Sequence, residues 1–220
     1  MMKITRHVYL VGGSSESHAS DAAIYLVKGD GKAALIDAGT GKGHTRVLKN
    51  IEEAGVGLGE VTSLFITHCH YDHTGGAELM RQATGCRIVA HALDADFLQM
   101  GDSRVTAASW YGERMEPTSV DLRVEGGEER FSVGGMELAF YHAPGHSPGS
   151  AVLTLVSDGL LVLFGQDVHG PLNDVLLSSR SDYVRSLEFM LSLEADVLCE
   201  GHFGVFAGKE KVREFIESFL

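Results

Sequence analysis

Residues 67–76 read Thr-His-Cys-His-Tyr-Asp-His-Thr-Gly-Gly, which crowds three imidazoles and one carboxylate into six consecutive positions. Apolar residues before this stretch predict a strand at 61–67, and the residues after it predict a helix at 75–83. So many ionisable side chains placed together are poorly stabilised without a cation. The stretch therefore indicates a metal site at the end of a strand.

The spacing within the stretch favours two neighbouring metal positions. Side chains alternate along an extended chain, so we expect His68 and His70 to project to one side. Asp72 and His73 can then reach an adjacent point. Cys69, between two of these residues, should point away from the metals as a small buried side chain.

Three further ligand-type residues follow strands later in the chain. His146 lies in a turn rich in proline and glycine, Asp167 comes directly after the predicted strand at 160–165, and His202 follows a short strand at 196–199. Glycine beside each of them permits a sharp change of direction. We predict that these three side chains join the motif in one site.

The composition is that of an ordinary folded protein with an unusual histidine content. The chain has 220 residues, of which 44% are hydrophobic and 11 are histidine, and its net charge is −12. The length suits one domain over residues 1–220. A chain this acidic is a poor partner for nucleic acid or an anionic membrane, so we expect a small-molecule substrate.

The cysteines and the N-terminus indicate the cellular compartment of the protein. Three widely spaced cysteines make no disulfide framework, and residues 1–13 lack the apolar segment of a signal peptide. No apolar run approaches the length needed to span a bilayer. We therefore expect a cytoplasmic protein, and the oligomeric state stays open.

Strands and helices are predicted in two runs, in which clustered strands are followed by helices. This order favours two stacked sheets covered by helices. The remaining predicted strands are 6–11, 22–28, 33–37, 87–90, 129–133, 136–142 and 150–156. The remaining predicted helices are 44–54, 92–100, 181–192 and 208–219, and residues 101–119 form a loop.

With these motifs in place, the chain resembles the metallo-β-lactamase-fold hydrolase superfamily, in its glyoxalase II and lactonase-like branch. The resemblance extends from the segment Ile-Asp-Ala-Gly at 36–39 to the final Gly-His at 201–202. It implies an α/β fold, a four-layer αββα sandwich of two mixed β-sheets faced by helices. Asp37 matches a position that supports the metal ligands in this superfamily.

The resemblance also implies how seven residues divide between two metals. The first metal would be held by His68, His70 and His146, the second by Asp72, His73 and His202, with Asp167 bridging them. Nitrogen and carboxylate ligands without a thiolate suit zinc, and also iron or manganese.

Hydrolysis is the reaction that this resemblance implies. Two adjacent metals share a water and lower its pKa, and the resulting hydroxide attacks the carbonyl of a thioester, lactone, ester or amide. Asp72 and Asp167 are the candidate catalytic residues that orient this water. The alternative is a persulfide dioxygenase with a single iron on His68, His146 and Asp167.

The loop at 101–119 is a candidate lid over the site. It holds the single tryptophan of the chain, Trp110, beside Tyr111, with Arg114 close by. Aromatic side chains supply rigid apolar walls, and arginine can bind a carboxylate or phosphate. The alternative is that both aromatic residues merely pack a short helix onto the sheet.

Two other segments are candidates for substrate contacts. His169 follows Asp167 by two positions and could donate a proton or a hydrogen bond to the substrate. The serine-rich segment Ser14 to Ser20 joins two strands and either overhangs the site or forms a plain hairpin loop.

Overall fold

The computed structural model describes residues 1–165 and 167–220 in full, together with the backbone of Gln166. Its strands form a seven-stranded sheet in the order β1 to β7 and a six-stranded sheet in the order β13-β12-β11-β10-β9-β8. The first sheet comprises β1 (Met2–Lys3), β2 (Val8–Gly12), β3 (Ile24–Lys28), β4 (Ala33–Ile36), β5 (Val61–Phe65), β6 (Arg87–His91) and β7 (Leu122–Val124). The second comprises β8 (Glu128–Val133), β9 (Met136–His142), β10 (Ala151–Ser157), β11 (Leu160–Gln166), β12 (Val197–Glu200) and β13 (Val205–Ala207).

Both sheets are mixed. The first is antiparallel from β1 to β4 and parallel from β4 to β7. The second is antiparallel except where β11 pairs with β12 in parallel. The helices are α1 (His44–Glu53), α2 (Tyr71–Thr74), α3 (Ala77–Thr84), α4 (Ala92–Met100), α5 (Arg180–Ser192) and α6 (Lys209–Glu217), with 3-10 turns η1 (Leu58–Glu60), η2 (Ala108–Tyr111) and η3 (Asp174–Leu176).

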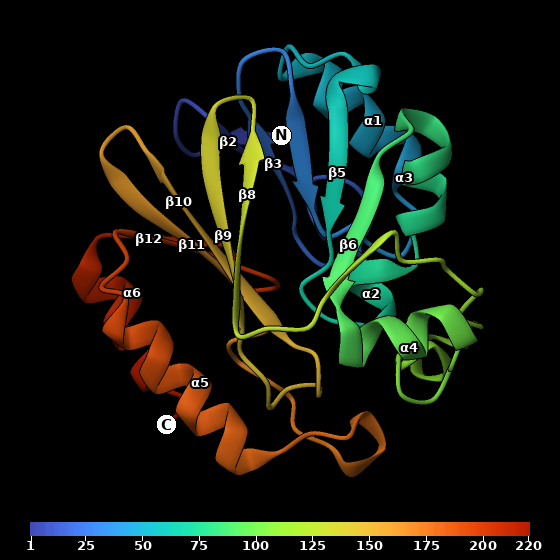
Figure 1. Ribbon diagram of the computed structural model, residues 1–220, viewed down its shortest axis with the longest axis vertical. Coiled ribbons are helices and arrows are strands. Elements are labelled where there is room, and N and C mark those ends of the chain that lie inside the picture. The colour runs from blue at the N-terminus through green and yellow to red at the C-terminus, as the bar shows by residue number, and fades with distance from the viewer.

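Side chains that alternate between the two faces of the central strands create the layers of the fold. On β3, Tyr25 belongs to the apolar cluster between the two sheets, whereas Leu26 belongs to the cluster beneath α1 and α3. Both side chains are fully buried, because successive residues of a strand face opposite sides. A third cluster, which includes Leu163 and Leu187, packs α5 and α6 onto the second sheet. Figure 1 shows the resulting order of helices, sheet, sheet and helices, which confirms the predicted αββα sandwich.

Besides the 3-10 turns, three short strands and one short helix were not predicted: β1, β7, β13 and α2. The three strands have only two or three residues each, too few for alternation to mark them. The prediction of an extended turn is right as far as His70, whose ψ is 147°, and wrong beyond it, where α2 begins. Asp72 and His73 therefore lie on one turn of helix.

No helix in the described part of the chain is long and apolar enough to cross a membrane. Cys69, Cys86 and Cys199 are all free and buried.

Candidate metal centre

All seven predicted ligand residues gather at one end of the two sheets. The first sheet supplies the residues that follow β5, and the second sheet supplies the residues of three loops, after β9, β11 and β12. One group brings a ligand atom each of His68, His70, His146 and Asp167 within 4.8 Å of one another. A second group does the same for Asp72, His73 and His202. The structure thus forms two adjacent groups, each able to hold a cation.

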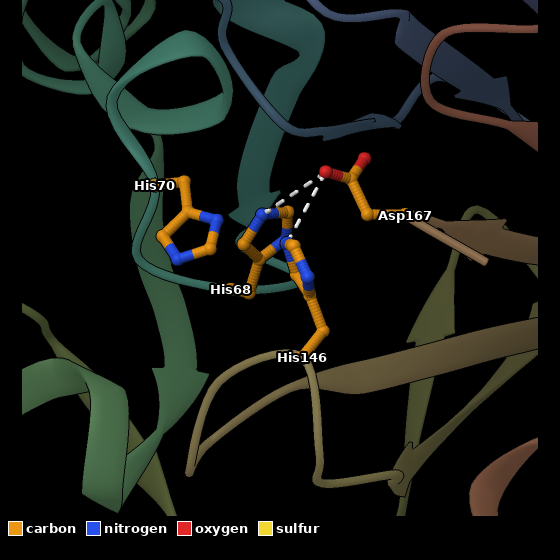
Figure 2. A group of neighbouring side chains, drawn as sticks. All are labelled: His68, His70, His146 and Asp167. Carbon is orange, nitrogen blue, oxygen red and sulfur yellow. Dashed lines mark ion pairs between the residues drawn. The ribbon is translucent and has the colours of Figure 1, made fainter. Parts of the chain in front are cut away.

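The Asp167 carboxylate lies between the two groups. Its Oδ2 is 3.2 Å from His146 Nε2 and 3.8 Å from His68 Nε2, as the dashed lines in Figure 2 show. Its Oδ1 is 3.1 Å from His73 Nε2 and 3.3 Å from His202 Nε2. One carboxylate therefore reaches both groups, with a separate oxygen directed to each.

The donor atoms of the centre fit a divalent metal. Among the described residues, five buried atoms at the centre have no hydrogen-bond partner: the Nε2 atoms of His68, His70, His73 and His146, and Asp167 Oδ1. Buried polar atoms are nearly always hydrogen-bonded, so such a cluster needs an explanation. Imidazole nitrogen and carboxylate oxygen are ligands that zinc prefers. Cys69 adds no thiolate, because burial raises the pKa of its thiol.

Asp37 orients two of the imidazoles. Its Oδ2 accepts hydrogen bonds from His73 Nδ1, at 2.7 Å, and from Thr67 Oγ1, at 2.8 Å. Because Thr67 gives its proton to Asp37, it accepts from His68 Nδ1, 3.0 Å away. Both rings therefore carry their proton on Nδ1 and keep the Nε2 lone pair for a metal. This is the supporting place predicted for Asp37.

The turn before His146 depends on glycine. Gly145 has a φ of 133°, and a Cβ there would lie 2.2 Å from the Tyr183 backbone nitrogen. Only glycine permits this close approach of the turn to α5. His146 Nδ1 then donates to the Pro171 carbonyl at 2.9 Å, which leaves its Nε2 directed to Asp167.

Sequence reasoning missed Asp94, which connects the loop of His68 and His70 to the loop of His146. Its side chain is buried and accepts hydrogen bonds from the Cys69 and Gly149 backbone nitrogens, at 2.8 and 2.6 Å, and from Ser147 Oγ, at 2.6 Å. Cys69 lies between two predicted ligands, and Ser147 follows another. In sequence, Asp94 is an ordinary acidic residue in the first turn of a helix, a common position that gave no signal.

Sequence reasoning also missed Glu200, at the end of β12. This residue is fully buried. Its Oε2 accepts hydrogen bonds from the backbone nitrogens of His202 and Phe203, at 2.6 and 2.8 Å, and its Oε1 accepts one from His169 Nδ1 at 2.8 Å. The signal that could have identified Glu200 is its position, because this carboxylate ends an apolar strand just before the predicted ligand His202.

The charges of the centre favour a cation in the second group. Burial alone would lower the pKa of His202, but the nearby Asp167 and Asp72 carboxylates raise it to about 10. Likewise, the pKa of His73 is raised overall by the carboxylates around it, despite its burial. In contrast, burial and neighbouring imidazoles lower the pKa of His68. A metal can take the place of the proton that the carboxylates stabilise in the second group.

The predicted substrate residues of the lid segment differ in their contacts and exposure. The Tyr111 ring lies 5.6 Å from the Tyr71 ring, and its pKa is raised by burial and by the nearby Asp72 carboxylate. Trp110 is 52% exposed, and Arg114 is exposed on the same segment. Tyr111 therefore borders the centre, while the side chains of Trp110 and Arg114 are exposed to solvent.

The lid segment is packed onto the first sheet by other residues. Val105, Ala108 and Met115 join the apolar cluster of that sheet, whereas the two aromatic residues do not. Tyr111 contacts this cluster through Tyr71, so both interpretations of the two aromatic residues stay open.

The loop after β2 also borders the centre. A cavity of about 180 Å³ lies beside His202, lined on one side by Gly13, Ser14 and Ser15 and on the other by Phe203 and Gly204. The serine-rich segment therefore contributes its first residues to a hollow next to the second group.

Comparison with known proteins gives relatives among hydrolases. The acyl-coenzyme A thioesterase MBLAC2 of Gallus gallus is 29% identical over 229 residues, which cover 90% of this chain and 78% of that protein. A hydroxyacylglutathione hydrolase of Rhodospirillum rubrum is 35% identical over 132 residues, 59% of this chain and 41% of its own. The probable metallo-hydrolase MJ0888 of Methanocaldococcus jannaschii is 29% identical, and the match spans 58% of its length.

Solved structures match the fold closely. The FEZ-1 metallo-β-lactamase of Legionella gormanii superimposes with a TM-score of 0.82 at 21% identity, covering 99% of this chain and 91% of its own. The family model of the metallo-β-lactamase superfamily matches residues 20–202, from the loop before β3 to the last predicted ligand. The chain therefore belongs to the metallo-β-lactamase superfamily and is a metal-dependent hydrolase.

Proposed function

We propose that the protein is a dinuclear hydrolase that binds two divalent ions, most suitably zinc. His68, His70 and His146 hold the first ion, and Asp72, His73 and His202 hold the second. The observation that carries this proposal is the position of Asp167, whose two oxygens face the two groups separately. When bound, such ions activate water as a nucleophile and polarise the carbonyl that it attacks.

The carboxylates of Asp72 and Asp167 serve as the catalytic residues. Each has an oxygen 3.3 Å from His202 Nε2, so both carboxylates border the second group, and Asp167 also reaches the first. A carboxylate in this place accepts a hydrogen bond from water and orients it toward the substrate. Asp37 and Asp94 keep the surrounding imidazoles and loops in position.

The substrate that we propose is a small molecule with a thioester, ester, lactone or amide carbonyl. The names of the two relatives that act on acyl-coenzyme A and on hydroxyacylglutathione favour a thioester. The net charge of −12 argues against nucleic acid as a substrate. Three free cysteines fit a cytoplasmic protein, and we treat residues 1–220 as one domain.

Metal analysis and a substrate screen test this function together. We expect elemental analysis to find about two metal ions per chain, and a series of thioesters, lactones, esters and amides to yield a substrate. Hydrolysis should persist without oxygen and cease with a chelator. One iron per chain with oxygen consumption on a persulfide would identify the dioxygenase instead.

The lid segment supplies the outer part of the substrate site in this proposal. Trp110 and Tyr111 form an apolar wall, and Arg114 meets an anionic part of the substrate. Trp110→Ala and Arg114→Ala should raise KM or change selectivity while both metals stay bound. Val156→Ala is the control, because Val156 is an exposed apolar residue, 64% exposed, near the end of β10 that lies away from the His146 loop. Unchanged KM and selectivity in both lid variants would exclude this role.

A further inference from the structure

His169 and Glu200 form a hydrogen-bonded pair at the edge of the metal centre. His169 Nδ1 lies 2.8 Å from Glu200 Oε1. The His169 ring lies 5.1 Å from the His202 ring and 5.0 Å from the Phe203 ring, with centroids measured in both cases. The pair therefore lies beside His202, a member of the second group.

Glu200 is held in one orientation. It is fully buried, and its second oxygen accepts both backbone N–H groups of His202 and Phe203. Its own carbonyl accepts the Tyr25 hydroxyl at 2.7 Å. A carboxylate with this many partners has no free rotation, so the oxygen that faces His169 is fixed.

This contact determines which nitrogen of His169 is available. A carboxylate only accepts hydrogen bonds, so Nδ1 carries the proton that His169 donates to Glu200. The neutral ring then has its lone pair on Nε2. One ring nitrogen of His169 lies within 4.8 Å of a ligand atom of Asp167 and of His202. The side chain is 20% exposed, so a bound substrate can reach it.

We propose that His169 is a catalytic residue that moves a proton through Nε2, and that Glu200 is the positioning residue that directs it. The inference rests on the proposed hydrolase function and assigns the group that protonates the product. His169 also belongs to a group with Asp167 and His202 that could hold a cation. In the proposed assignment seven other residues hold both ions, so His169 faces the substrate instead.

The proton transfer balances over one turnover. As a water oxygen bonds to the substrate carbonyl carbon, an O–H bond of that water breaks and its proton moves to His169 Nε2. The bond from the carbonyl carbon to the leaving sulfur, oxygen or nitrogen then breaks, and that atom takes the electron pair and the proton from Nε2. One water is consumed, and His169 returns to its starting state. The Glu200 carboxylate stabilises the positive ring between the two transfers.

Replacing His169 tests the proton transfer directly, with whichever substrate the screen identifies. His169→Ala should lower kcat about 100-fold, since positioned proton transfer contributes about 10²- to 10⁴-fold. We expect KM to change less than about threefold, the metal content to stay at the wild-type value, and added imidazole to restore part of kcat. His7→Ala is the matched control, a partly buried histidine bonded to the Lys28 carbonyl at 2.8 Å, and should keep wild-type kinetics.

Three results would overturn the role of His169. Wild-type kcat in His169→Ala would remove it from the reaction. Loss of a metal ion would make it a ligand, and loss of activity without imidazole rescue would make it structural. Absence of any metal-dependent hydrolysis in the wild-type protein would instead refute the proposed function.

A double-mutant cycle tests the positioning role of Glu200. Glu200→Gln should lower kcat at least tenfold in the wild-type background and have no further effect on the residual kcat of His169→Ala, because Glu200 acts through that ring. Equal effects in both backgrounds would overturn the pairing. Nitrogen-15 NMR of the wild-type imidazoles, which does not depend on whether the variant folds, should show His169 protonated at Nδ1, and an Nε2–H form would contradict the pair.

Discussion

Asp94 offers the sharpest test of how the centre is built. In Asp94→Ala, the Cys69 and Gly149 backbone N–H groups lose their acceptor, while Ser147 Oγ can turn to Ser150 Oγ, 2.8 Å away. A buried donor left without a partner costs about 1–3 kcal/mol, so we expect the free energy of unfolding to fall by about 2–6 kcal/mol. Asp94→Asn keeps one acceptor and should lose roughly half as much.

The same change should weaken metal binding. Asp94 connects the loop of His68 and His70 to the loop of His146, and loss of such support typically lowers metal affinity about 10- to 100-fold. Urea unfolding of the metal-free protein measures the stability, and competition with a chromogenic chelator measures zinc affinity.

The matched control for Asp94 lies on the same helix. The Asp96 side chain is 57% exposed and pairs with Arg123 at 2.6 Å, so Asp96→Asn should change stability by less than about 0.5 kcal/mol. The reasoning is refuted if Asp94→Ala loses no more stability than Asp96→Asn. It is also refuted if Asp94→Ala loses stability while its zinc affinity stays at the wild-type value.

Three further outcomes follow from the titratable groups. His202→Ala should lower the metal content from about two ions to about one per chain by elemental analysis, and an unchanged content would contradict the assignment. In the metal-free protein, Asp167 and Asp72 raise the pKa of His202 from 6.5 to about 10 despite its burial. The contribution of His202 to stability is therefore complete below pH 6.5 and is lost as the pH rises through about 10. Thermal melts should show that Tm falls over this pH window, and the fall should be smaller in His202→Ala. Burial and the stacked His142 ring lower the pKa of His91 from 6.5 to about 4. The free energy of unfolding should therefore decrease, by up to about 3 kcal/mol, as the pH falls from 6.5 to about 4. Urea titrations of His91→Asn should show a smaller dependence on pH.

The ligand residues could be predicted because their signals are local. His68, His70, Asp72 and His73 share one short motif, and the later ligands each follow an apolar strand beside a glycine. The alternation of apolar residues in the long central strands also predicts the two sheets. Each of these patterns is complete within a few residues of the chain.

The supporting carboxylates could not be predicted in this way. Asp94 bonds to residues 25 and 53 positions away, and Glu200 bonds to His169, 31 positions away. Their roles depend on which loops the fold brings together, and no local pattern marks such a contact. The short edge strands and α2 were missed for a related reason, because pairing with neighbours and loop geometry define them more than their own residues do.

The division of the centre between the two sheets has a consequence for dynamics. Residues 68–73 come from the first sheet and His146, Asp167 and His202 from the second, so with the proposed ions bound, any motion that separates the sheets at this end would have to release them. A ligand that binds only the closed form stabilises it by about 4 kcal/mol at a thousand times its dissociation constant. Amide hydrogen exchange in the strands that face each other should therefore slow as the metal concentration rises, and the metal would act as a reversible crosslink between the two sheets.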